Sequence, residues 1–203
     1  GGDVLKTVGF EKAPPDKQLS VINAGFRCFG RDGFQKTAMS EIAEAAGVSK
    51  AALFHYFGTK ADLYNFLFDF ACDEISKKIP VGTEDFMESI SIGTKVKFEV
   101  MARYPGMYDF LVAVMQDESE EAEGLRRNAN TRAIEEGTMT LFAKVDWSKF
   151  RSNVSPMDAM NLVTWISMGC LKGNIEKSQA EILSEVERYL DLIKKAIYKE
   201  NVK

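Results

Sequence analysis

The chain has 203 residues, of which 45% are hydrophobic and 28% are charged, with a formal net charge of −4. This is the balance of a globular protein that is long enough to bury a core without disulfides or bound metal. No stretch approaches the roughly 18 consecutive apolar residues of a membrane span, and the N-terminus lacks a secretory signal pattern, so we expect a cytoplasmic protein with no membrane contact.

Cysteine and histidine usage restricts the chemistry. Three widely separated cysteines do not form a disulfide framework and indicate a reducing compartment. With His55 as the single imidazole, no zinc-ligand spacing and no Cys–His or Ser–His arrangement can be recognised. We therefore predict no catalytic residues, no metal and no cofactor, and we interpret the chain as a protein that is not an enzyme.

The local patterns predict an all-α fold. Sustained apolar–polar alternation and Asn-Gly or Asp-Gly hairpin signals are absent, whereas helix-capping patterns recur at Thr59–Asp62, Ser155–Asp158 and Ser178–Glu181. We interpret Gly1–Gly2 as the scar of a tag and expect residues 1–15 to form a flexible arm. About nine helices are then expected, at residues 16–30, 38–46, 49–56, 60–78, 84–103, 105–116, 118–144, 156–173 and 179–199.

A helix-turn-helix is predicted within residues 16–60. Met39 and Ile42 share one apolar face of a short helix, Gly47 stands where the chain must turn sharply, and Ser49 can cap a second short helix. Two short helices joined in this way form a helix-turn-helix, and the helix before them completes a three-helix core. The alternative is an ordinary helical hairpin, because short helices joined by glycine are common in helical proteins.

The second helix of such a unit enters the DNA major groove with its N-terminal residues leading. Lys50 can contact a guanine edge or a phosphate, and hydroxyls at the start of the preceding helix can hold a phosphate. The small net positive charge of residues 1–60, on an otherwise acidic chain, fits this role. The predicted DNA-binding residues are Thr37, Ser40, Ser49, Lys50, Ala51, Ala52, Phe54, His55, Tyr56 and Lys60.

A longer pattern extends the motif over about residues 17–64. Its residues are Ala24, Phe29, Gly33, Phe34, Thr37, Ile42, Ala43, the run 46–49, the run 53–57 and the run 60–63. This segment resembles the N-terminal domain of the tetracycline-repressor-like (TetR) family of bacterial transcriptional regulators. The resemblance implies a homodimer that binds a pseudo-palindromic operator in double-stranded DNA, and a C-terminal domain, here residues 61–203, that binds a small molecule and dimerises.

The sequence departs from the family pattern at two places. Phe54 stands where members commonly carry a tyrosine that reaches a phosphate, and Ala51 and Ala52 stand where small hydroxyl residues or glycine are common. DNA specificity is therefore expected to rest on Lys50, Tyr56, contacts from the alanines to thymine methyl groups, and DNA shape.

The C-terminal domain carries weaker signals. Methionines and aromatic residues at helical spacing can line an adaptable pocket for a largely apolar effector, although the same residues can equally fill a core. The predicted ligand contacts are Met101, Tyr104, Phe110, Phe142 and Trp165. By the same resemblance, the helices at residues 156–173 and 179–199 are expected to form the dimer interface.

Together these patterns predict a dimeric, sequence-specific transcriptional regulator, a repressor whose operator binding is modulated by the effector. The alternative is a small-molecule binding or sequestering protein with a degenerate DNA-binding head, which Phe54 and the Ala51–Ala52 pair would favour.

Overall fold

A computed structural model describes residues 9–128, 131–172 and 177–200. All regular elements in these ranges are helices, and the one β-type contact there is an isolated bridge between Phe150 and Tyr198. The all-α prediction is confirmed. None of the helices in the described ranges is both long and apolar enough to cross a lipid bilayer.

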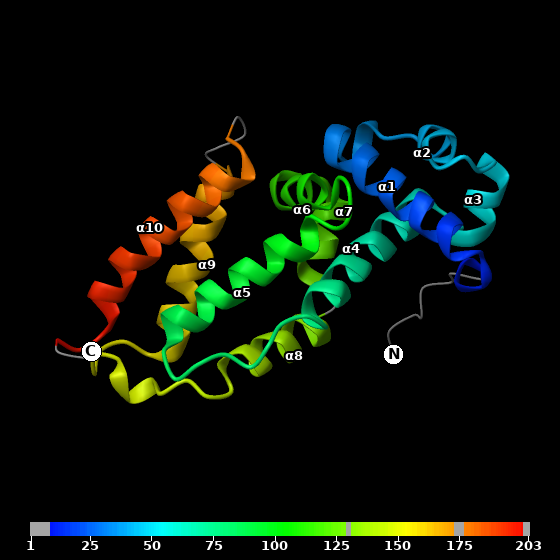
Figure 1. The fold of residues 1–203 in the computed structure, drawn as a ribbon. Helices are drawn as coiled ribbons and strands as arrows, with labels where there is room; N and C mark the ends of the chain where they lie inside the picture. Colours follow the sequence, from blue (N-terminus) through cyan, green and yellow to red (C-terminus); the bar gives the residue numbers. More distant parts are fainter. Residues whose placement is uncertain (1–8, 129–130, 173–176, 201–203) are drawn as a thin grey trace. The chain divides into compact units, whose positions relative to one another are not determined.

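Ten α-helices and two short 3₁₀ helices follow one another along these ranges (Figure 1). They are η1 (Phe10–Lys12), α1 (Pro15–Lys36), α2 (Met39–Ala46), α3 (Lys50–Phe57), α4 (Lys60–Ser76), α5 (Phe86–Met101), α6 (Met107–Gln116), α7 (Glu120–Asn128), α8 (Thr131–Phe142), η2 (Trp147–Lys149), α9 (Pro156–Lys172) and α10 (Gln179–Ile197). The single helix predicted over residues 118–144 is found as α7 and α8.

The chain divides into two compact units. Unit 1 comprises Gly1–Lys78 and Val96–Gly137, and unit 2 comprises Ile79–Lys95 and Thr138–Lys203. Unit 1 therefore contains the predicted helix-turn-helix together with α4, the end of α5, α6, α7 and the start of α8. The functional division at residue 60 stays a prediction.

Unit 1 is organised around the close packing of α1 on α6. A Cβ atom built on Gly30 would lie 2.8 Å from the backbone nitrogen of Phe110, and one on Gly106 would lie 2.7 Å from the backbone nitrogen of Arg27. Because both helices lack side chains at these points, their backbones approach directly. The fully buried ring of Phe110 then packs 5.2 Å from that of Phe26, which joins α1 and α6 in one core.

The first helix is longer than predicted. The sequence predicts a helix that ends at residue 30, but α1 continues to Lys36. It crosses a kink at Gly33, whose φ of 73° and ψ of 176° are not helical. Glycine accepts this left-handed φ without steric cost. The extra turn brings Phe34 into the core, where it is 5% exposed.

Unit 2 combines the α9–α10 pair with an aromatic cluster. The ring of Phe86 lies 5.1 Å from that of Phe142, 5.6 Å from that of Trp147 and 5.5 Å from that of Phe150. Tyr198 extends the cluster, with its ring 5.4 Å from Phe150. The segment between α8 and α9, which carries Trp147 and Phe150, thus contributes to the aromatic cluster of this unit.

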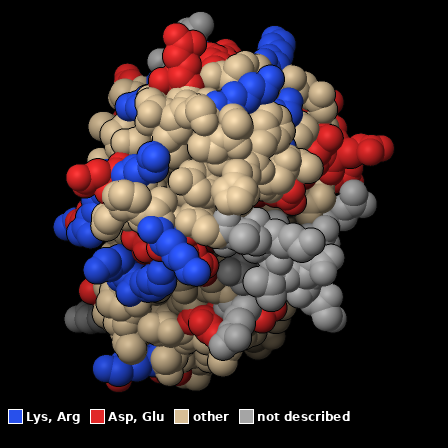
Figure 2. All heavy atoms as spheres, turned by 90° about the vertical axis from the view of Figure 1, so that its right-hand side faces the viewer, with Lys and Arg blue, Asp and Glu red and all other residues tan. Residues whose placement is uncertain are grey.

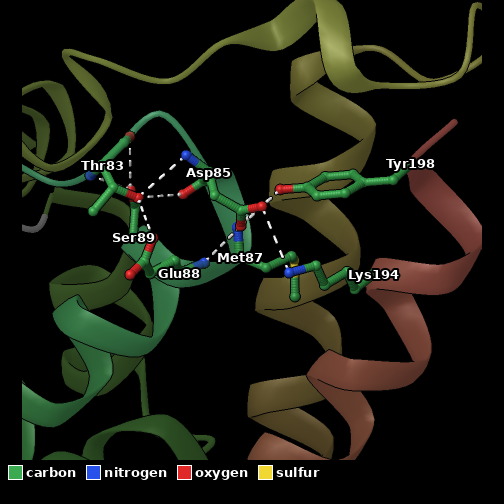
Figure 3. A network of polar contacts seen from close by, with 7 residues as sticks. All are labelled: Thr83, Asp85, Met87, Glu88, Ser89, Lys194 and Tyr198. Carbon is green, nitrogen blue, oxygen red and sulfur yellow. Dashed lines mark hydrogen bonds and ion pairs between the residues drawn. The ribbon is translucent and has the colours of Figure 1, made fainter. Parts of the chain in front are cut away.

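A polar network ties the start of α5 to the end of α10 (Figure 3). The Asp85 carboxylate accepts hydrogen bonds from the Glu88 N–H (2.9 Å) and the Tyr198 hydroxyl (3.0 Å), and the Lys194 ammonium lies 3.6 Å away. Burial acts to raise the pKa of Asp85, but the hydrogen bonds and the Lys194 charge together outweigh this effect. The pKa of Asp85 therefore lies below its usual value. Burial also raises the pKa of Tyr198 to about 12. The network therefore keeps Asp85 charged and Tyr198 protonated.

Candidate nucleic-acid interface

The turn between α2 and α3 has the geometry of a helix-turn-helix. Gly47 ends α2 in the left-handed conformation, with φ 68° and ψ 31°. The Val48 N–H then donates to the Ala43 carbonyl at 3.0 Å, which closes the turn. Ser49 caps α3 by accepting the Ala52 N–H at 3.0 Å. The predicted motif and the roles of its glycine and serine are confirmed.

Helix α3 has one buried side and one exposed side. Leu53 and Phe57 are 0% and 1% exposed and anchor the helix to the core of unit 1. The outer side carries Lys50, Ala51, Phe54 and His55, all exposed, preceded by the exposed Ser49; Ala52 and Tyr56 are half-buried. Seven of the ten predicted DNA-binding residues thus belong to one short helix and its cap.

The surroundings of α3 are only weakly charged. Figure 2 turns the side of the molecule that carries α3 toward the viewer and shows a broad uncharged area, with Lys and Arg in separate groups among carboxylates. Arg31, in the same three-helix head, is already ion-paired with Asp32 and Glu41. A ligand on this face would therefore meet polar and apolar side chains more than a continuous basic band.

Thr37 and Lys60 point into the protein instead of toward a ligand. The Thr37 hydroxyl is buried and donates to the carbonyls of Cys28 at 3.1 Å and Gly33 at 2.7 Å. The Lys60 ammonium donates to the carbonyls of Phe34 at 2.8 Å and Thr37 at 3.1 Å, and lies 4.4 Å from the Phe34 ring centroid. The last carbonyls of a helix lack partners within it, so these two side chains cap the end of α1.

This capping role was not visible in the sequence, because Lys60 and Phe34 are 26 residues apart. Ser40, in the first turn of α2, remains exposed as predicted for a phosphate contact. We accordingly keep Ser40 among the candidate contacts and treat Thr37 and Lys60 as residues that position the head.

Tyr56 packs against Phe10, which lies within the predicted N-terminal arm. The Phe10 ring is 1% exposed and lies 5.5 Å from the Tyr56 ring, 4.8 Å from the Phe57 ring and 5.4 Å from the Phe66 ring. The arm is therefore packed against the end of α3 from Gly9 onward. The sequence signal for this packing is the aromatic Phe10 followed by the charged Glu11 and Lys12.

The five predicted effector contacts are divided between the two units. Met101, Tyr104 and Phe110 belong to unit 1, and Phe142 and Trp165 belong to unit 2. Phe110 is fully buried in the core, and the Tyr104 hydroxyl donates to Glu74 at 2.7 Å. Phe142 packs in the aromatic cluster, whereas Trp165 is 66% exposed on α9.

In the described parts of the chain, no three His, Cys, Asp or Glu side chains are grouped to hold a metal ion.

Trp165 belongs to an exposed apolar surface on the last two helices. Met157 and Leu162 on α9 are 64% and 37% exposed, and Leu192 on α10 is 51% exposed. Exposed apolar side chains mark an interaction surface where they form one contiguous patch.

Known proteins share the head and the helical architecture. Residues 21–66 match the family described as bacterial regulatory proteins, tetR family. The chain is 33% identical over 104 residues to the HTH-type transcriptional regulator RutR of Escherichia coli (strain K12). This alignment covers 50% of this chain and 49% of RutR. It is 24% identical over 194 residues to the HTH-type transcriptional repressor AcnR of Corynebacterium efficiens, covering 91% and 94%. The alignment with RutR thus spans about half of that relative's length.

Solved structures extend the likeness to nearly the whole chain. SmeT, the repressor of the Stenotrophomonas maltophilia multidrug efflux pump SmeDEF, superposes with a TM-score of 0.66 at 16% identity and covers 93% of this chain and 95% of SmeT. The complex of SmeT with triclosan superposes with a TM-score of 0.68 at 14% identity, covering 94% and 95%. At these identities the likeness shows a shared fold.

Proposed function

We propose that this chain, which matches the tetR family of bacterial regulatory proteins over residues 21–66, is a dimeric, sequence-specific DNA-binding transcriptional regulator that acts as a repressor. The observation that carries this proposal is the exposed side of α3, which a left-handed glycine and a serine cap hold on a rigid three-helix head. A rigid helix with its polar N-terminus exposed is the element that enters a major groove. We place the protein in the cytoplasm, where it would reach chromosomal DNA.

The proposed DNA contacts follow from exposure and position on the motif. Lys50 can reach base edges or a phosphate, Ala51 and Ala52 can contact thymine methyl groups, and Ser40 with the free N–H groups of the α2 start can hold a phosphate. Ser49, Phe54, His55 and Tyr56 complete the proposed contact set. Thr37 and Lys60 support it from inside the head.

The proposed homodimer forms through α9 and α10. The exposed Met157, Leu162 and Trp165 on α9, with Leu192 on α10, supply apolar side chains that a second copy would bury. A two-fold dimer presents two heads, so we propose a pseudo-palindromic operator with half-site centres about one DNA turn apart, ~34 Å.

The proposed effector is a small, largely apolar molecule, and the SmeT–triclosan complex supports this class of ligand within the shared fold. Met101 and Tyr104, half-buried in unit 1, are the predicted contacts that retain accessible surface there without forming its core. We assign Phe110 and Phe142 to core packing and Trp165 to the dimer surface. Effector binding would favour a dimer whose heads no longer fit both half-sites. The size of this shift is limited by the difference in the effector's affinity for the two states of the dimer.

Selection of duplexes from a random DNA pool by the purified chain tests this proposal. An inverted repeat is expected, with an affinity that falls as salt rises, because every phosphate contact made by a cationic side chain releases counterions. A folded dimer that enriches no sequence would contradict the proposal. It would favour the alternative, a small-molecule binding protein with a degenerate head.

A further inference from the structure

The phenyl ring of Phe54 is exposed on the outer side of α3. Phe54 is 39% exposed, whereas the neighbouring Leu53 and Phe57 are 0% and 1% exposed. In the described part of the chain, no aromatic ring pairs with that of Phe54. The ring therefore contributes little to the core, although it stands on the helix that the head presents outward.

The partner of this ring is the ammonium of Lys50. Lys50 is the first residue of α3 and lies one turn before Phe54, so the two side chains share one flank of the helix. The Lys50 Nζ atom is 5.8 Å from the centroid of the Phe54 ring, within the range of a cation–π contact. No carboxylate in the described residues forms an ion pair with Lys50. The charge is thus held over an apolar ring and left available to a ligand.

We propose that Lys50 and Phe54 act as one reading unit that recognises a guanine with a thymine one or two base pairs away in each half-site. The ammonium donates to guanine O6 and N7, and the ring packs against the thymine C5-methyl group. The 5.8 Å separation of the two groups spans one to two base-pair steps of ~3.4 Å. This inference rests on the proposed function and specifies the DNA sequence that the same site reads.

The rest of the head favours base reading over phosphate attraction. A phenyl ring cannot accept or donate a hydrogen bond to a phosphate, so Phe54 can contribute to binding through an apolar contact alone. Arg31 is paired with two carboxylates, and the Lys60 ammonium is bonded to backbone carbonyls. With these cations engaged and the surrounding face mostly uncharged (Figure 2), contacts at base edges carry a larger share of the affinity.

Chemically altered operators test the inference directly. Each thymine of the selected duplex is replaced in turn by deoxyuridine, which lacks the methyl group, and each guanine by 7-deazaguanine, which lacks the N7 acceptor. For the wild-type chain we expect one thymine per half-site at which deoxyuridine weakens binding about threefold. We also expect a guanine within two base pairs of it at which 7-deazaguanine weakens binding about tenfold.

Three variants assign these losses to side chains. Phe54→Ala should abolish the deoxyuridine effect and reduce the 7-deazaguanine effect, because the ammonium loses its ring. Lys50→Ala should abolish the 7-deazaguanine effect and keep the deoxyuridine effect. Glu44→Ala, an exposed residue of α2 outside the proposed contact set, is the matched control and should keep both effects.

The outcomes separate the inference from the proposed function. If the operator binds specifically but Phe54→Ala retains the full deoxyuridine effect, the reading unit is overturned and the regulator stands. The same conclusion follows if the sensitive thymine and guanine lie more than two base pairs apart. If the folded dimer enriches no duplex, the proposed function fails and the inference fails with it.

Discussion

Removing the Tyr198 hydroxyl tests how the end of α10 holds the start of α5 in unit 2. The Tyr198→Phe variant keeps the ring, which is 5% exposed and packs against Phe150. It removes the hydrogen bond to the Asp85 carboxylate, at 3.0 Å, and the acceptor of the Met87 N–H, at 3.2 Å (Figure 3). The change therefore isolates two polar contacts from the packing around them.

The two contacts set the expected magnitude. A hydrogen bond to a charged group contributes about 1.5–3 kcal/mol, and a buried N–H left without a partner costs about 1–3 kcal/mol. Asp85 keeps the Glu88 N–H and the Lys194 ammonium, so the losses do not simply add. We expect Tyr198→Phe to lower the free energy of unfolding by about 2–3 kcal/mol at pH 7.

The pH dependence gives the sign of the effect independently. The pKa of Tyr198 is higher in the folded chain than in the unfolded chain, so its contribution is complete below about pH 10 and is lost as the pH rises toward 12. The difference between wild type and variant should therefore shrink over this range. Asp85 has a lowered pKa, so its contribution is lost as the pH falls below about 4.

Urea unfolding followed by tryptophan fluorescence measures this effect, because both tryptophans, Trp147 and Trp165, lie in unit 2. Tyr189→Phe on α10 is the matched control. Tyr189 is half-buried and its hydroxyl has no hydrogen bond in the described part of the chain, so its removal should change stability little. An unfolding midpoint of Tyr198→Phe equal to wild type at pH 7, or a difference that persists unchanged at pH 12, would refute the reasoning.

Four further changes test other parts of the account. Gly30→Ala should lower the thermal unfolding temperature followed by circular dichroism, because the added Cβ meets the backbone of α6 at 2.8 Å and overpacking costs about 1–3 kcal/mol; an unchanged temperature would exclude direct backbone contact. Lys60→Met should destabilise the head by about 1 kcal/mol in the same assay, and an equally stable variant would show that the α1 end needs no cap. Trp165→Glu should convert the dimer to a monomer in sedimentation velocity, and a persistent dimer would place the interface elsewhere. Lys50→Ala should weaken operator binding roughly tenfold in fluorescence anisotropy, while an equal loss on unrelated DNA would indicate a phosphate contact instead.

Local chemistry was sufficient to predict the helix starts and the motif. The three predicted capping patterns, at Thr59–Asp62, Ser155–Asp158 and Ser178–Glu181, are all present. Gly47 has the left-handed conformation that the turn requires. These features depend on residues within three or four positions of one another. Their spacing alone therefore identifies them.

Contacts between distant segments could not be predicted in this way. The roles of Thr37 and Lys60 depend on the carbonyls at the end of α1, which in turn depend on the kink at Gly33. Phe10 is buried because the arm folds back onto α3. Apolar residues at helical spacing fit a core, a ligand site or a dimer surface equally well, so the sequence could not separate Phe110 from Trp165, which the structure finds 0% and 66% exposed.

The central claim is that two copies of the α2–α3 head bind one operator together. Its most direct test compares the affinity for the selected inverted repeat with that for the same duplex carrying five extra base pairs between the half-sites. This insertion turns the half-sites to opposite faces of the DNA, because one turn takes about 10.5 base pairs. We predict that affinity falls to the level of a single half-site. Equal affinity for the two duplexes would contradict a two-headed regulator.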